Sequence, residues 1–223
     1  MASELFVDNI TGKTGTSGGA PITLSGDTAT LSGTGVTFPT GHIVKTYHAV
    51  FKGEQSFTRG SGTATTSVVD TDYILVGTGA SGTSGSSLSI TCDTPASSSS
   101  KYLITASITG SNINAEIFAI KFFYNNSGVS SDTSLPDYNS GTSSLQTHTH
   151  FGASHNSSGG SIYSTRQLGG SYLWSPSSSL PQTIMVKVTT YQSDNMRINR
   201  PDDNGNYSYN VKSISTLVVQ EIA

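Results

Sequence analysis

A seven-residue repeat over residues 22–42 constrains the fold of this chain more than any other feature of its sequence. Its three units begin Ile22-Thr23-Leu24, Ala29-Thr30-Leu31 and Val36-Thr37-Phe38, and each closes on turn-forming residues. A spacing of seven is typical of coiled coils, but Thr, Ser and Gly fill these units and are poor helix formers. Because apolar residues two positions apart share one face of an extended chain, the repeat predicts short strands joined by turns.

Each unit offers a small apolar face that one chain cannot bury alone, so the repeat would find its partners in other chains. Repeats of this kind become stable by stacking or by pairing with copies of themselves. We therefore expect an intertwined β stem over residues 21–42, in which three chains wind together. Its subunit interface would contain Ile22, Leu24, Leu31, Val36 and Phe38. The alternative is a flexible linker whose periodicity is accidental.

Residues 1–20 precede the stem and contain one short apolar run, Leu5-Phe6-Val7, followed by a glycine-rich stretch. This segment has too few apolar residues to fold by itself. It is either a disordered tail or an attachment segment that becomes ordered when it docks on a larger body.

The composition favours a β-sheet protein over a disordered one. Charged residues make up only 11% of the chain and the net charge is -3, whereas Ser and Thr together number 69. Disordered chains usually combine low hydrophobicity with a high net charge. From residue 43 onward the chain predicts an all-β, jelly-roll-like antiparallel sandwich over residues 43–223, without a convincing amphipathic helix. We expect its strands near residues 43–51, 67–75, 86–92, 101–108, 115–124, 184–191 and 211–222.

The last predicted strand has apolar residues on both faces. Ile214, Thr216, Val218 and Ile222 share one face, whereas Leu217 and Val219 share the other. One face would pack on the sandwich core and the other on a neighbouring subunit. On this basis we add Leu217 and Val219 to the predicted subunit interface.

Several classes of partner are disfavoured by the sequence. With a pI of about 5.9 the chain has no basic face for nucleic acid. No segment approaches the length of a membrane span, and the first residues do not form a secretion signal, so we expect synthesis in a cytoplasm. The single cysteine, Cys92, excludes an intrachain disulfide and is expected to be buried and inert.

Three parts of the sequence together resemble fibre proteins of tailed bacteriophages, especially marine and cyanobacterial phages. They are residues 35–44 (GVTFPTGHIV), residues 88–91 (LSIT) with 99–104 (SSKYLI), and residues 215–222 (STLVVQEI). In such proteins a short N-terminal attachment segment leads to a β-sandwich head similar to the trimeric jelly rolls of complement and tumour-necrosis-factor type. The resemblance departs in a Ser/Gly-rich insert over about residues 125–179.

This resemblance implies a homotrimeric fibre that is made in the host cytoplasm and becomes part of the virion. Its anchor would be Leu5, Phe6 and Val7, which would contact a tail or capsid protein. The head would bind a glycan or protein of the host surface. Two alternatives remain open: a capsid decoration fibre with a structural role, and a lectin-like carbohydrate-binding module.

The insert carries the side chains best suited to recognition, because Tyr, Trp and Arg are favoured at contacts and loops at one end of a sandwich often bind ligands. For Trp174 and Tyr172, which precede Pro176, packing within the head or at the subunit seam is the alternative interpretation. The candidates are Tyr138, His148, His150, Phe151, Tyr163, Arg166, Tyr172 and Trp174.

His148 and His150 lie two residues apart and would share one face of a strand. If three chains brought this pair to a threefold axis, six imidazole nitrogens could hold one iron ion, and some phage fibres use such pairs. The alternative is that both are exposed polar residues without a metal. We expect no other cofactor.

No catalytic motif stands out. The chain contains no Gly-x-Ser-x-Gly elbow between a strand and a helix, and no carboxylate pair has a suggestive spacing. The segment Asp202-Asp203-Asn204-Gly205-Asn206 matches a hairpin turn better than a calcium loop. We therefore expect a protein that is not an enzyme.

Overall fold

The computed structural model describes fifteen strands and the turns that adjoin them. The described residues are 9–10, 22–25, 28–31, 41–58, 73–77, 87–112, 117–126, 132–135, 152–155, 165–176, 181–190, 195–200 and 213–223. The chain divides into two compact units, residues 1–42 and residues 43–223. The second unit is called the head below.

The first unit contains three antiparallel strands, β1 (Asn9–Ile10), β2 (Ile22–Ser25) and β3 (Thr28–Leu31), in the order β1-β2-β3. β2 and β3 belong to successive units of the repeat and pair with each other, with Ile22 opposite Leu31 and Leu24 opposite Ala29. This corrects the expectation that the repeat finds strand partners only in other chains. Val36 and Phe38 lie outside the described residues, as do Leu5, Phe6 and Val7.

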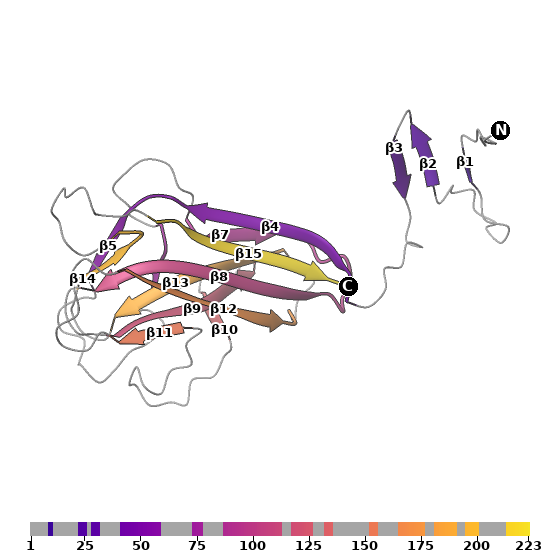
Figure 1. Ribbon diagram of the computed structural model, residues 1–223. Helices are drawn as coiled ribbons and strands as arrows, with labels where there is room; N and C mark the ends of the chain where they lie inside the picture. The colour runs from indigo at the N-terminus through magenta and orange to yellow at the C-terminus, as the bar shows by residue number, and fades with distance from the viewer. Residues whose placement is uncertain are drawn as a thin grey trace. The chain divides into compact units, whose positions relative to one another are not determined.

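One sheet of the head is built around the twelve-residue strand β8 (Lys101–Asn112). On one side β8 pairs with β12 (Arg166–Trp174). On its other side it pairs first with β15 (Ser215–Ile222) and then with the short strand β14 (Asn195–Ile198). β4 (Ile43–Phe51) lies beyond β15, and β5 (Gln55–Thr58) lies beyond β14. All of these pairs are antiparallel (Figure 1).

The second sheet of the head has β9 (Ile117–Asn126) and β13 (Gln182–Thr190) at its centre. β10 (Thr133–Leu135) and β11 (Gly152–His155) pair with β9. β6 (Ile74–Leu75) and β7 (Ser89–Cys92) pair with β13. These pairs are antiparallel too.

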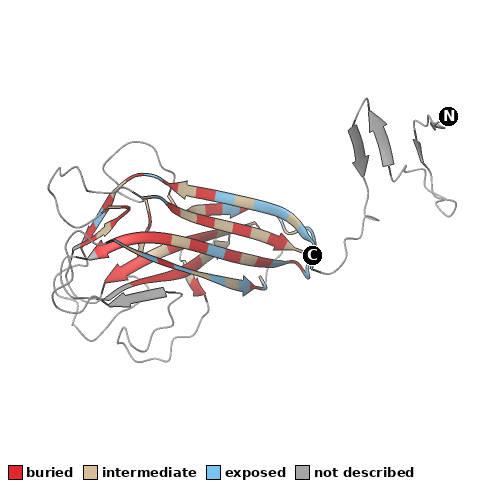
Figure 2. Ribbon diagram, viewed as in Figure 1, coloured by how far each residue is buried: buried red, intermediate tan, exposed pale blue. Residues whose placement is uncertain are grey.

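The two sheets pack face to face around one core, and burial alternates along β8, β12 and β15 of the first sheet (Figure 2). In β15 every second residue is buried, beginning at Ser215, and in β8 the buried series begins at Tyr102. No helix is present among the described residues. The predicted fold class, an all-β antiparallel sandwich of jelly-roll type, is therefore confirmed.

The predicted strands agree with the observed ones to different degrees. The prediction of residues 43–51 coincides with β4, and those near 86–92, 101–108, 115–124, 184–191 and 211–222 overlap β7, β8, β9, β13 and β15 with shifted ends. Of residues 67–75, only 73–75 are described, and Ile74–Leu75 form β6. The insert of residues 125–179 proves to supply β10, β11 and the nine-residue strand β12, the last of which pairs along β8.

A buried asparagine makes hydrogen bonds at the position where the pairing of β8 changes from β15 to β14. Asn199, which follows β14, donates its backbone N–H to Thr109 O (2.8 Å), and Thr109 in turn donates its N–H to Ser215 Oγ (3.1 Å). The Asn199 amide nitrogen donates to Phe51 O (2.8 Å) and Gly53 O (2.9 Å), while its Oδ1 accepts from Ser215 Oγ (2.6 Å). Backbone groups that neither strand pairs are thereby satisfied.

Asn199 also adopts a left-handed backbone conformation, with φ of 63°. Asn tolerates this region better than most residues other than Gly. Both its side chain and its backbone therefore suit this position.

Replacing Asn199 should destabilise the head. We expect Asn199→Ala to lower the free energy of unfolding by about 2–4 kcal/mol, since it leaves buried carbonyl groups without donors and keeps a strained φ. Asn199→Gly relieves the strain and should cost roughly 1 kcal/mol less. Urea denaturation followed by circular dichroism measures both. Equal stability of Asn199→Ala and the unchanged protein would contradict this role.

Candidate functional site

The described recognition candidates all lie on β12, and none of them is fully exposed. Arg166 begins the strand and is half-buried, and Tyr172 is half-buried and packs against the core. Trp174 is only 8% exposed. The other candidates, Tyr138, His148, His150, Phe151 and Tyr163, lie outside the described residues.

Trp174 packs between the two sheets. Its ring centroid lies 4.5 Å from that of Tyr124 on β9 and 6.0 Å from that of Tyr102 on β8. Stacked and tilted aromatic pairs of this kind stabilise a core beyond the area they bury. Trp174 is therefore a core residue, and we remove it from the set of surface recognition candidates.

Leu217 and Val219 also belong to the core of a single chain. Both are 0% exposed, with Leu217 opposite Ala49 and Val219 opposite Tyr47 on β4. A side chain that is fully enclosed by its own subunit cannot contact a neighbouring one, so the expectation that they form a subunit interface was wrong. The face of β15 that remains accessible carries Thr216, Val218, Gln220 and Ile222.

This accessible face continues over four adjacent strands of the β8 sheet, and we call it the open face. Its rows follow from the register: Thr46, Gln220, Leu103 and Leu173 form one row, and His48, Val218, Thr105 and Ser171 form the next. The exposed and half-exposed segments of these strands are seen in Figure 2. The open face comprises Thr46, His48, Val50, Lys101, Leu103, Thr105, Ser107, Gln167, Gly169, Ser171, Leu173, Thr216, Val218, Gln220 and Ile222.

Polar side chains on the open face bond to one another across the strands. Thr105 Oγ1 and Ser171 Oγ lie 2.9 Å apart, and Gln167 Nε2 donates to Ser107 Oγ. Apolar residues lie among them, and Leu173 is 51% exposed. Lys101, at one end, is the only Lys, Arg, Asp or Glu of the open face. The face is therefore nearly uncharged, and part of its hydrogen-bonding capacity is already used within the chain.

Sequence reasoning named Thr216, Val218 and Ile222 as one face of the last strand but did not assign them to the interface. The open-face residues of β8 and β4 could have been predicted from the alternation in residues 101–108 and 43–51. The residues between core positions of a strand must point to the other side of the sheet.

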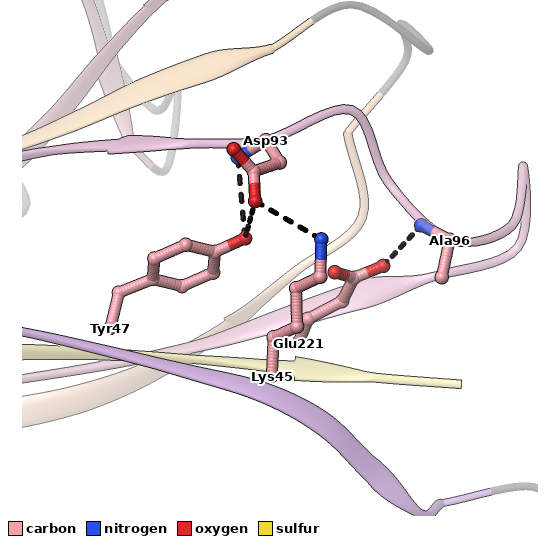
Figure 3. A network of polar contacts seen from close by, with 5 residues as sticks. All are labelled: Lys45, Tyr47, Asp93, Ala96 and Glu221. Carbon is pink, nitrogen blue, oxygen red and sulfur yellow. Dashed lines mark hydrogen bonds and ion pairs between the residues drawn. The ribbon is translucent and has the colours of Figure 1, made fainter. Parts of the chain in front are cut away.

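A polar network lies where β4 and β15 meet the turn after β7 (Figure 3). Lys45 Nζ lies 3.1 Å from Asp93 Oδ2, and the Tyr47 hydroxyl donates to the same oxygen (3.4 Å) while accepting from Asp93 N (3.2 Å). Glu221, which is fully buried, accepts from Ala96 N at 2.5 Å. The network fixes the turn of residues 93–97 to the end of the sheet.

Four side chains in or beside this network have raised pKa values. Hydrogen bonding to Asp93 raises the pKa of Lys45, and burial raises the pKa of Tyr47. Burial also raises the pKa of Tyr102 and raises that of the Cys92 thiol to about 12. A thiol with such a pKa is almost wholly protonated near neutral pH and is a poor nucleophile. The prediction that Cys92 is buried is confirmed, and its raised pKa fits the expectation that it is inert.

A second apolar cluster lies on the face of the β9–β13 sheet that is turned away from the core. It contains Tyr73, Ala119, Phe123 and Met185. Beside it, Lys187 Nζ lies 2.5 Å from Asp132 Oδ2 and 4.5 Å from the centroid of the Phe123 ring. An ion pair and a cation–π contact thus hold β10 and β13 against β9.

Among the described residues, no group of three or more His, Cys, Asp or Glu side chains could hold a metal ion. The iron site proposed at His148 and His150 lies outside these residues and stays a prediction. Within the described part of the chain, no helix has the length and apolar character needed to cross a membrane.

Comparison with known proteins gives fold similarity only. No family model matches the chain, and no curated protein matches its sequence. Among solved structures, the chain is similar to Eiger TNF from S. frugiperda, with 11% identity and a TM-score of 0.40 over 80% of this chain and 93% of that chain. It is also similar to infectious bursal disease virus Gx strain, with 11% identity and a TM-score of 0.37 over 90% of this chain and 40% of that chain. The match thus spans less than half of the viral chain.

The raised pKa of Cys92 predicts a loss of stability at alkaline pH. Because the folded thiol titrates near pH 12 and the unfolded thiol near its ordinary value of 9.0, the unfolded state releases a proton first as the pH rises. The contribution of Cys92 is therefore complete below about pH 9 and is lost progressively above it. In urea titrations from pH 7 to pH 11, Cys92→Ala should flatten this decline. An identical decline in the variant would contradict the assignment.

Proposed function

We propose that the chain is a virion fibre protein of a tailed bacteriophage, with a homotrimeric head that binds the host surface. The N-terminal segment would attach to a tail or capsid protein. The sequence resemblance supports this proposal, and so does the division of the chain into a small N-terminal unit and a large β-sandwich head.

The open face is the structural feature that best supports a homotrimer. It presents half-exposed apolar side chains such as Leu103 and Val218 between hydroxyl groups that bond to each other. Burying a polar group costs little when its hydrogen bond is already made, and burying the apolar groups contributes roughly 25 cal/mol per Å². With a single charge at one end, the face meets copies of itself with little repulsion. These properties suit three open faces that converge around a threefold axis.

The head would then act as a rigid support for recognition. Loops at one end of a sandwich are the usual place for binding residues, and Tyr138, His148, His150, Phe151 and Tyr163 fall in the long insert between β10 and β12. Three weak sites on each trimer, and several trimers on each particle, would give firm attachment to a host glycan or protein. No catalytic step is part of this proposal.

The test of the trimer is the mass of the full chain in dilute solution by light scattering. We expect three times the 23.2 kDa of one chain. Val218→Asp, on the open face, should yield a folded monomer, whereas Val219→Asp, in the core, should prevent folding. Thr91→Asp, at an exposed position on β7, is the control that should remain trimeric. A folded monomer of the unchanged chain would reject the proposed assembly.

The division into two units predicts separable roles. A chain that lacks residues 1–42 should keep the melting temperature of the head, because the described residues that form or pack against its core begin at Tyr47. It should bind host cells and reduce adsorption of the phage, yet it should be missing from purified particles. Incorporation of this truncated chain into particles would contradict an N-terminal anchor, and a lack of binding to host cells would contradict recognition by the head.

A further inference from the structure

His48 is the one ionisable group within the central rows of the open face. It is exposed, and the register places it opposite Val218 on β15, between Thr46 and Val50 along its own strand. Its imidazole therefore lies within the surface that we assign to the threefold contact. A side chain there is solvated in the free chain and loses water when the copies come together.

No carboxylate on the open face could balance a charge on His48. The neighbouring positions of β15 are Thr216, Val218 and Gln220, and none of them ionises in the physiological range. The open-face residues of β8 and β12 add only Lys101, which is also basic. Lys45, Asp93 and Glu221 belong to the network at the core-facing side of the sheet.

We propose that His48 makes the assembly of the head dependent on pH, with the trimer stable when the imidazole is neutral and dissociating when it is protonated. This inference rests on the proposed trimer. Three copies of the face would bring three imidazolium groups into one contact, with no opposite charge among the described open-face residues. Like charges that are brought together and desolvated in an interface oppose association. Imidazole groups change charge within about pH 5–8, so modest acidification is a sufficient signal.

The experiment measures the mass of the full chain at about pH 8 and about pH 5.5, the two sides of the imidazole range. We expect the unchanged chain to be trimeric at the higher pH and its apparent dissociation concentration to rise roughly tenfold or more at the lower pH. His48→Gln, which stays neutral, should be trimeric at both. His48→Lys should dissociate at both. Fluorescence of Trp174, the only tryptophan, reports whether the head stays folded throughout.

His42→Gln is the matched control, because His42 is exposed and precedes β4 without belonging to the open face. This variant should dissociate on acidification as the unchanged chain does. A trimer that persists at the lower pH, or a His48→Gln variant that dissociates like the unchanged chain, would overturn the role of His48 and leave the trimer intact. A monomer at both pH values would instead reject the proposed assembly itself.

Discussion

The hydrogen bonds around Thr109 allow the long strand β8 to pair with two strands, β15 and β14, along one edge. The sheet that carries the open face depends on these bonds. β8 pairs with β15 up to Ser107 and with β14 from Gly110, so the backbone of Thr109 faces a gap between two strands. There the backbone N–H of Asn199 donates to Thr109 O, and the hydroxyl oxygen of Ser215 accepts from Thr109 N. The same Asn199 amide holds the end of β4 through Phe51 O and Gly53 O. Buried polar groups that are fully paired in this way specify one arrangement of strands.

Much of the head could be predicted because alternation survives in its strands. Residues 101–108 and 215–222 place every second side chain in the core, as their sequence indicated. Alternation does not say which face is the core when both carry apolar residues. For this reason Leu217 and Val219 were predicted to lie at the interface. Their pairing with Ala49 and Tyr47 on β4 shows instead that they face the core.

Two further differences between the predicted and the observed strands have local causes. β12 begins with Arg166 and contains Gly169-Gly170, a composition that resembles a loop, although Leu168, Tyr172 and Trp174 keep the period of a strand. A Cβ at Gly169 would lie 2.7 Å from Ala106 O, so a close approach of β12 to β8 accounts for this glycine. In the N-terminal unit, Gly26-Asp27 between two apolar runs was a hairpin signal. The seven-residue spacing instead led to the prediction that the repeat pairs with other chains.

The pairing of β4 with β15 has a consequence for the order in which the protein forms. Residues 43–51 meet residues 215–222, so the sheet cannot close until the ribosome has made nearly all of the head. Until then β8 has no β15 to pair with along one of its edges. Contacts between such distant segments form slowly, and the exposed strands are open to wrong associations meanwhile. The β2–β3 pair, separated by two residues, needs no such delay. Chains interrupted during synthesis would therefore carry a formed N-terminal hairpin and an unfinished head, which marks them as incomplete.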